Sequence, residues 1–527
     1  MKLFSNRLRS AQSGQAILLI ALAMVGLVAF VGLMVDVGVL FIEQGKIKRG
    51  IDSGSIAAVQ QFRKNFVVAD LVAAAQNFLL LNDTAADQII VYRCKDNDPA
   101  DGIEDPATVG DGTVHDTALC TEPVRRKLIR VEAQRWVAFS FLRVIGLQGR
   151  MIRASSVSEA ASIDLVLAID TSTSMAYDTY TGPCATSSLQ THCATDGTYF
   201  DTENPAICNY SSTTPCQPLA DVKTVARDFV DTMFFPYDRV AVVAMTSQDA
   251  GGTRVVTPVL ELSGSQTAVE NKIDDLTVFE PPNCDTNPSK GPCILYGDVD
   301  HDDNPGTAPV FGFAGLDCPA LRADLDGDGN ADGDPTTCNS SNIGGILREA
   351  GLRFIASGYQ RDESLWIVIL LAGGPANATD SVTGKPDGFC PADTWLYQPT
   401  PPPPLNPFCR DSDLDNAGNV LITRHYDPTD ADYDADDYAR EWADFIADPD
   451  DGQGVTVFTI GLGGLVREAP RGDPYSGENL LIYTAEVAGD ETGVPANHGF
   501  YSYAPTTAEL DDIFAEIAAN IFTRITQ

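Results

Sequence analysis

The feature that most restricts the fold of this chain is an uncharged apolar segment near its N-terminus. Residues 16–35, AILLIALAMVGLVAFVGLMV, contain no charged side chain. Twenty helical residues extend for about 30 Å, the thickness of the hydrocarbon core of a bilayer. A cleaved signal peptide has a shorter apolar core followed by small residues. Val35 instead leads directly into Asp36 and an amphipathic continuation, so we expect an uncleaved transmembrane helix.

The charges on the short flank predict the orientation of this helix. Lys2, Arg7 and Arg9 lie in residues 1–15, and basic residues are retained on the cytoplasmic side. We therefore expect a cytoplasmic basic tail, a single membrane pass, and an extracytoplasmic location for the rest of the chain.

The twelve cysteines all follow the predicted anchor. An even number of cysteines in an exported chain indicates disulfides. Pairing between sequence neighbours is the simplest connectivity, because each bridge would close one surface loop, although spacing alone leaves other connectivities open. The predicted disulfide cysteines are Cys94, Cys120, Cys184, Cys193, Cys208, Cys216, Cys284, Cys293, Cys318, Cys338, Cys390 and Cys409.

The composition restricts the classes of partner. With 44% hydrophobic and 20% charged residues the chain has the composition of a folded protein, but its formal net charge is -38. That charge excludes nucleic acid, which requires clustered Lys and Arg. It agrees equally with a cation-binding surface and with a merely soluble one. The five histidines are scattered, and the motifs of metalloproteases, serine hydrolases and phosphate-binding loops are absent. We expect neither an enzyme nor a small-molecule substrate.

Residues 36–160 have the pattern of a small α+β region. A helix is predicted to continue over 37–66, strands over 88–94 and 126–134, and a further helix followed by a strand after residue 136. A long hydrophobic helix that leads into a small sheet is the outline of a pilin-like stalk.

From residue 161 apolar strands alternate with amphipathic helices. This pattern predicts an α/β domain with a doubly wound, mostly parallel sheet, covered on both faces. Three long insertions interrupt it, near 176–215, 280–338 and 376–432. The predicted strands are 163–169, 238–245, 254–260, 365–371, 454–461 and 499–504, and the predicted helices are 218–234, 266–276, 342–357, 434–447, 478–487 and 507–523.

Hard oxygen donors follow the first of these strands. Asp170, Ser172 and Ser174 lie in the stretch DTSTS. Ligands of parallel sheets bind at the carboxyl ends of the strands, and one carboxylate with two hydroxyls suits Mg²⁺, Mn²⁺ or Ca²⁺.

Residues 161–527 resemble a von Willebrand factor A domain, which has a Rossmann-like fold. DTSTS matches the family's Asp-x-Ser-x-Ser metal-ion-dependent adhesion site, SSNIGGILREAGLRF resembles its Gly-Thr-Asn-Ile-Gly stretch, and VILLAGGPAN resembles its Leu-Thr-Asp-Gly-x-Pro stretch. The N-terminal SGQAILLIALAMVGLVAFVGLMVDVGVLFIEQGKIKRGIDSGSIAAV is similar to TadE/TadG-like proteins of the tight-adherence (Flp) pilus machinery.

The resemblance implies a degenerate adhesion site. Its ligands would be Asp170, Ser172, Ser174 and Ser341, the last in place of the family's Thr, while Gly373 stands where the family has Asp. One fewer carboxylate predicts weaker binding of a hard cation. The alternative is that these side chains only hydrogen-bond their own loop.

A second candidate cation site lies in an acidic insertion. The stretch DLDGDGNADGD has the alternation of a calcium loop, but Pro335 stands where a bidentate Glu would close it. The alternative is an acidic surface loop. The candidate ligands are Asp324, Asp326, Asp328, Asn330 and Asp332.

Two functions follow from these expectations. The first is a membrane-anchored component of tight-adherence pilus biogenesis or adhesion, whose von Willebrand A head binds other pilus or envelope proteins, or a surface ligand. The second is a structural stalk or minor pilus subunit with a degenerate, non-binding head.

Overall fold

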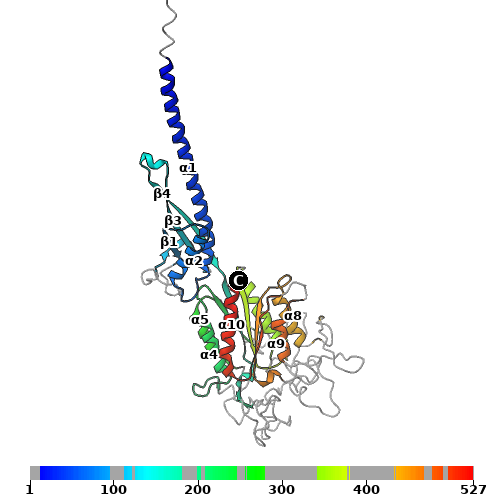
Figure 1. The fold of residues 1–527 in the computed structure, drawn as a ribbon. Helices are drawn as coiled ribbons and strands as arrows, with labels where there is room; N and C mark the ends of the chain where they lie inside the picture. Colours follow the sequence, from blue (N-terminus) through cyan, green and yellow to red (C-terminus); the bar gives the residue numbers. More distant parts are fainter. Residues whose placement is uncertain are drawn as a thin grey trace, which may run out of the picture. The chain divides into compact units, whose positions relative to one another are not determined.

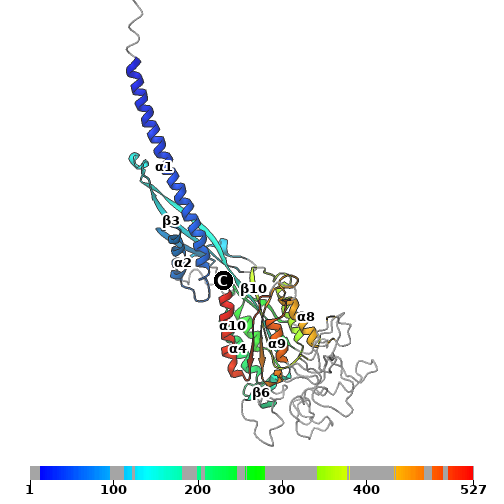
Figure 2. The same ribbon diagram turned by 45° about the vertical axis from the view of Figure 1, so that its right-hand side comes forward.

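The computed structural model divides into two compact units, Met1–Ala160 and Ala161–Gln527 (Figures 1 and 2). The residues that the structure describes are 12–94, 112–121, 125–180, 199–202, 208–245, 256, 258–278, 341–361, 363–376, 379, 426, 433, 435–467, 477–490 and 496–525.

The first unit is built on one continuous helix, α1 (Gln12–Val59). Among the described residues it is the helix whose length and composition suffice to cross a membrane. The predicted helix extended to residue 66, but α1 ends at Val59, where the chain turns. Asn65 adopts a positive φ of 61° in that turn, a conformation that Asn tolerates better than most residues.

Helix α2 (Val68–Leu81) was not anticipated from the sequence. It packs antiparallel against α1 at two glycines. A Cβ on Gly50 would lie 2.8 Å from Leu79 Cδ2, and a Cβ on Gly54 would lie 2.9 Å from the Ala75 carbonyl oxygen. Because only a hydrogen fits at these positions, the two backbones can approach closely.

A four-stranded sheet of order β2-β1-β3-β4 completes this unit. Its long element is an antiparallel hairpin, paired from Lys127↔Ala160 to Ala138↔Gly149. The helix predicted after residue 136 is wrong: β3 continues, and the connection contains only the short 3-10 helix Leu142–Ile145, which ends at Gly146 with φ 95°. The strands are β1 (Gln88–Arg93), β2 (Val114–His115), β3 (Lys127–Ala138) and β4 (Gly149–Ala160).

Strand β4 lies along α1. The Gln44 amide donates to the Arg153 carbonyl at 2.9 Å, and Lys48 Nζ donates to the Ser155 carbonyl at 3.3 Å. Farther along, the hydroxyl oxygens of Ser55 and Ser158 are 2.7 Å apart. Residue numbers rise together on both elements, so β4 runs parallel to α1.

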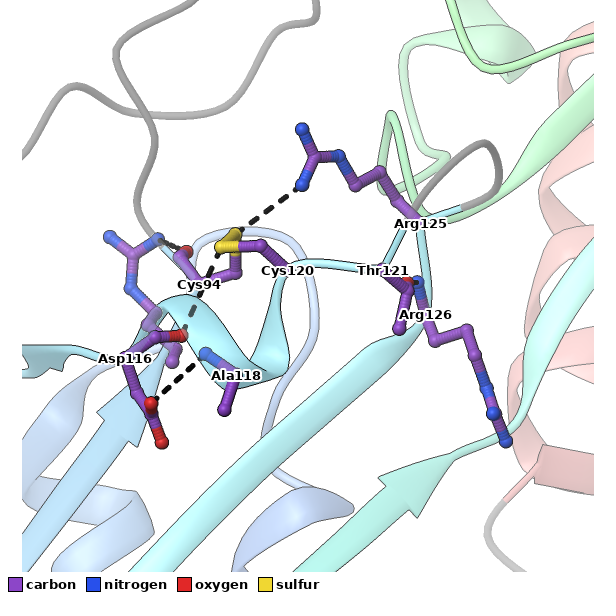
Figure 3. Close-up of a disulfide and its surroundings, with 8 residues drawn as sticks. Cys94, Asp116, Ala118, Cys120, Thr121, Arg125 and Arg126 are labelled. Carbon is purple, nitrogen blue, oxygen red and sulfur yellow. Dashed lines mark hydrogen bonds between the residues drawn. A yellow bond between two sulfur atoms is a disulfide. The ribbon is translucent and has the colours of Figure 1, made fainter.

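The predicted disulfide between Cys94 and Cys120 is present, with Cα atoms 4.9 Å apart (Figure 3). It joins the end of β1 to the segment after the short 3-10 helix Thr117–Leu119. The Asp116 carboxylate caps that helix by accepting from the Ala118 N–H at 3.1 Å, and the Arg125 guanidinium lies 3.4 Å from Cys94 Sγ.

The second unit contains a six-stranded sheet of order β12-β11-β10-β5-β8-β9. All neighbours are parallel except β9, which is antiparallel to β8. The predicted parallel sheet is therefore confirmed, and the edge strand β9 begins four residues later than expected. The strands are β5 (Ser162–Asp170), β8 (Arg239–Met245), β9 (Pro258–Ser263), β10 (Ser364–Ala372), β11 (Thr456–Leu462) and β12 (Tyr501–Ala504).

Helices cover both faces of this sheet (Figures 1 and 2). Leu165, Leu167 and Ile169 of β5 pack with one group of helices, and the alternate residues Val166 and Ala168 pack with the other. Burial on both faces explains why the strands are continuously apolar. The first group is α4 (Leu219–Val230), α5 (Gln266–Asp274) and α10 (Leu510–Ile525), and the second is α6 (Ile343–Ile355), α8 (Ala435–Ala447) and α9 (Gly477–Glu486).

The structure describes part of the first predicted insertion, three residues of the third (376, 379 and 426) and none of the second. The first contains an antiparallel hairpin, β6 (Tyr177–Tyr180) with β7 (Tyr199–Thr202), and the predicted Cys208–Cys216 disulfide. The other eight cysteines lie outside the described residues, and their pairing stays a prediction.

Candidate functional site

The candidate site is built around Asp170, the last residue of the central strand β5. Its side chain is 0% exposed. One carboxylate oxygen accepts from the Ser172 N–H at 2.8 Å, and the other accepts from the Gly373 N–H at 2.8 Å. The carboxylate is thus held between the loop that follows β5 and the end of the neighbouring strand β10.

The DTSTS loop orients its own polar groups. Thr171 Oγ1 donates to the Met245 carbonyl at the end of β8 at 2.8 Å, which ties the loop to a third strand. The Ser172 hydroxyl, 1% exposed, hydrogen-bonds the Asp170 carboxylate. Ser174 belongs to the 3-10 helix Thr173–Ala176, and its side chain lies outside the described part.

Ser341 lies beside the same edge of the sheet. Its Oγ is 3.8 Å from the position that a Cβ on Gly374 would take, and its residue is 8% exposed. The N-cap of the helix that follows, α6, is Asn342. The Asn342 side chain accepts from the Gly345 N–H at 2.8 Å, as an Asn at this position does. Ser341 therefore precedes the capped helix.

Gly373 contributes more than the sequence suggested. It has no side chain to offer, but its backbone N–H is one of the two that hold Asp170. Sequence reasoning missed this contact because backbone atoms carry no residue-specific signal. Gly373 is not among the positive-φ glycines of the described chain, so a left-handed backbone does not oppose a side chain there.

A second buried carboxylate, Asp164, lies near the opposite end of β5 and provides a contrast. It is 0% exposed like Asp170. Arg239 Nη2 lies 2.7 Å from its Oδ2, and Arg361 contacts its other oxygen. Burial alone would raise the pKa of Asp164, but the hydrogen bonds and charges of the two guanidinium groups hold it below its usual range.

Asp170 has no such compensation. Burial raises the pKa of the Asp170 carboxyl, and the hydrogen bonds from Gly373 and Ser172 only partly oppose that shift. Within the described part of the chain, no Lys or Arg forms an ion pair with it. A buried carboxylate without a positive neighbour is costly to ionise, and a bound cation would supply the missing charge.

The residues present fit a weak site for a hard divalent cation. Carboxylate and hydroxyl oxygens are ligands of Mg²⁺ and Mn²⁺, and Asp170, Ser172 and Ser341 supply them. The set carries a single negative charge. Among the described residues no group of three or more His, Cys, Asp or Glu gathers into a metal cluster. The arrangement therefore favours oxygen coordination completed by water or by a ligand from outside the chain.

The predicted calcium loop cannot be placed. Its candidate ligands, from Asp324 to Asp332, lie outside the described residues, and calcium binding there stays a prediction.

No protein-family model matches the chain, and no curated protein matches it. Solved structures similar to it include the pilus adhesin SpaC from Lactobacillus rhamnosus GG, with 11% identity over 76% of this chain and 33% of that chain, at a TM-score of 0.33. Proximal thread matrix protein 1 from the mussel byssus, with a zinc-occupied MIDAS motif, has 11% identity over 69% of this chain and 46% of that chain, at a TM-score of 0.29.

The N-terminal domains of the type V pili tip protein Mfa5 from Porphyromonas gingivalis have 13% identity over 81% of this chain and 55% of that chain, at a TM-score of 0.29. The chain thus spans between a third and about half of the length of these structures. At these identities and TM-scores, the likeness assigns neither a family nor a function.

Proposed function

We propose that this chain is a membrane-anchored, extracytoplasmic component of tight-adherence pilus biogenesis or adhesion. Its 161–527 unit would bind a protein partner or a surface ligand at the carboxyl edge of the six-stranded sheet, and it would catalyse no reaction. The observation that carries the proposal is the buried Asp170 carboxylate at the edge where parallel sheets bind their ligands, which has no positive neighbour among the described residues.

A divalent cation at Asp170 would link the chain to its partner. Asp170, Ser172 and Ser341 would hold Mg²⁺ or Mn²⁺, and a carboxylate from the partner would complete the shell. Calcium at the acidic loop is a separate part of this proposal. The sequence resemblance to TadE/TadG-like and von Willebrand A proteins supports the assignment to the pilus machinery, and the α1 helix supports the anchor.

The test of the cation is calorimetry with Mg²⁺ and Mn²⁺ on the full chain in detergent, with the acidic loop neutralised by Asp326→Asn and Asp328→Asn. We expect weak binding that Asp170→Ala abolishes. Gly373→Asp should tighten it, because a second carboxylate raises the charge of the ligand set and the backbone N–H to Asp170 is retained. Asp228→Ala, an exposed carboxylate on α4, is the matched control and should leave binding unchanged.

The test of the partner is retention of envelope proteins and pili on the immobilised chain. Binding that EDTA and Asp170→Ala both remove, and that Asp228→Ala leaves intact, supports metal-dependent recognition. Binding that is insensitive to both EDTA and Asp170→Ala would refute it.

The second candidate is a structural stalk or minor pilus subunit with a non-binding head. One observation favours it: Gly373 provides no carboxylate, and its N–H occupies one oxygen of Asp170. If neither Asp170→Ala nor Gly373→Asp changes cation affinity, this alternative is the correct one.

A further inference from the structure

The turn of the β3–β4 hairpin carries a group of exposed apolar side chains. Val144 is 87% exposed, Ile145 73%, Leu147 53% and Phe141 49%. They follow one another around the short 3-10 helix Leu142–Ile145. We call residues 141–147 the hairpin tip. Exposed apolar groups this dense indicate a contact surface.

Two contacts fix the position of the hairpin tip along α1. The Asp36 carboxylate accepts from the backbone N–H groups of Ser140, Phe141 and Leu142, at 2.8, 2.9 and 2.6 Å. One turn earlier, a Cβ on Gly32 would lie 2.8 Å from Phe141 Cβ. The tip therefore lies beside residues 32–36 of α1.

The lengths of α1 and β4 agree with this position of the hairpin tip. Ser158 of β4 lies opposite Ser55 of α1, and Gly149, at the start of β4, is nine residues nearer the tip. Nine strand residues cover about 30 Å, which corresponds to about 20 residues of helix and returns to the level of Asp36.

Gly32 and Asp36 also mark the end of the apolar segment of α1. Every described side chain of α1 from Ala16 to Val31 is exposed, whereas Gly32 and Asp36 are buried by the tip. If residues 16–35 occupy the hydrocarbon core, Gly32 lies at its outer boundary. A side chain in contact with Gly32 must lie at the same depth.

The charge of the hairpin tip differs from that of the whole chain. Residues 138–151 contain Arg143 and Arg150 and no acidic residue, although the chain carries a formal net charge of -38. Both arginines are exposed. Apolar side chains flanked by arginines are the composition of segments that bind at the interface of a membrane, where the cations meet lipid phosphates.

We propose that the hairpin tip inserts into the interface of the outer leaflet beside α1, so that Phe141, Val144 and Ile145 contact lipid and Arg143 and Arg150 contact phosphate groups. The occupant of the apolar surface is lipid because the surface is continuous with the predicted span. This inference rests on the proposed membrane anchoring by α1. The chain would then have a second contact with the membrane, which fixes the tilt and rotation of α1.

The test is photo-crosslinking in the full chain, reconstituted in vesicles of phosphatidylethanolamine and phosphatidylglycerol that contain a tagged phospholipid. The photoreactive residue p-benzoylphenylalanine replaces Val144, Leu27 or Leu81 in three separate variants. Val144 and Leu81 are similarly exposed, at 87% and 77%, so neither substitution disturbs the core. Leu81 lies two residues after Leu79, which packs at Gly50 of α1. Gly50 is about 21 Å farther along α1 than Asp36.

We expect lipid adducts at Leu27 and at Val144, with a yield at Val144 several-fold above that at Leu81. Adducts at Leu27 but none at Val144 would overturn this inference and leave the anchor intact. Absence of adducts at Leu27 would refute the anchor itself. A crosslinked dimer at Val144 in place of lipid adducts would assign the tip to contacts between copies of the chain and would also overturn the inference.

Discussion

The two buried carboxylates of β5 show how one residue type serves two purposes. Asp164 is neutralised by Arg239 and Arg361, whereas the described donors to Asp170 are the uncharged groups of Ser172 and Gly373. The apolar run before DTSTS made the position of Asp170 at the end of its strand predictable from the sequence. The ion pairs of Asp164 with Arg239 and Arg361 were not predictable. In the sequence Asp164 only interrupts an apolar strand, and Arg361 lies 197 residues away.

Neutral substitutions should separate these two purposes. Asp164→Asn leaves two buried guanidinium groups without a charge partner and should cost about 3–5 kcal/mol of unfolding free energy. Asp170→Asn removes one hydrogen-bond acceptor, at about 1–3 kcal/mol, and relieves a buried charge, so the net loss should be smaller. Melting of the 161–527 unit with and without Mg²⁺ is the measurement. Stabilisation by Mg²⁺ should persist in Asp164→Asn and vanish in Asp170→Asn, and the reverse result would contradict our assignment.

The raised pKa of Asp170 predicts a pH dependence of cation binding. The folded pKa lies above the unfolded value, so without metal the contribution of Asp170 to stability is complete below the unfolded pKa and is lost as pH rises through the folded one. A cation competes with the proton, and its affinity should therefore increase as pH rises through that pKa. Calorimetry between about pH 4 and pH 8 tests this, because the ordinary carboxyl pKa is about 4. An affinity that is independent of pH would exclude Asp170 as a ligand.

At the scale of elements, the sequence predicted the second unit better than the first. Continuous apolar strands between amphipathic helices allowed β5, β8, β10 and β11 to be placed within a few residues. Helix α2 was missed because its Ala- and Leu-rich stretch lies between two stronger patterns. The contact between Asp36 and the hairpin tip was missed because it joins residues 104 to 106 positions apart, and Asp36 marked only the end of the apolar run.

Asp36 should hold the hairpin against α1. Asp36→Ala leaves the N–H groups of Ser140, Phe141 and Leu142 without their acceptor, and each such loss costs about 1–3 kcal/mol where the group stays buried. Hydrogen exchange measured by mass spectrometry should accelerate at residues 140–142, while β3 and β4 nearer Lys127 and Ala160 stay protected. Lys48→Ala, a change at a more exposed contact of the same helix, is the control. Unchanged exchange at the tip in Asp36→Ala would show that packing at Gly32 alone retains it.

At the scale of the whole molecule, the predicted anchor places both units on one side of the membrane. The α1 helix runs from Gln12 through the apolar segment to Val59. If residues 16–35 span the membrane, the first unit lies directly at the surface from which α1 emerges. Protease added to intact spheroplasts should therefore digest the 161–527 unit and leave a membrane-embedded fragment that contains residues 16–35. Protection of the 161–527 unit, with digestion only after lysis, would reverse the proposed topology.

The long β3–β4 ladder has a mechanical consequence. Only Ala161 separates the end of β4 at Ala160 from the start of β5 at Ser162. If the 161–527 unit binds a surface as proposed, tension between it and the anchor would enter the first unit at Ala160. The component of that tension along β4 would run parallel to α1. That component would load the ladder from Lys127↔Ala160 to Ala138↔Gly149 in shear. Its hydrogen bonds share the force together and do not open one after another, so this geometry suits a tether that has to resist pulling.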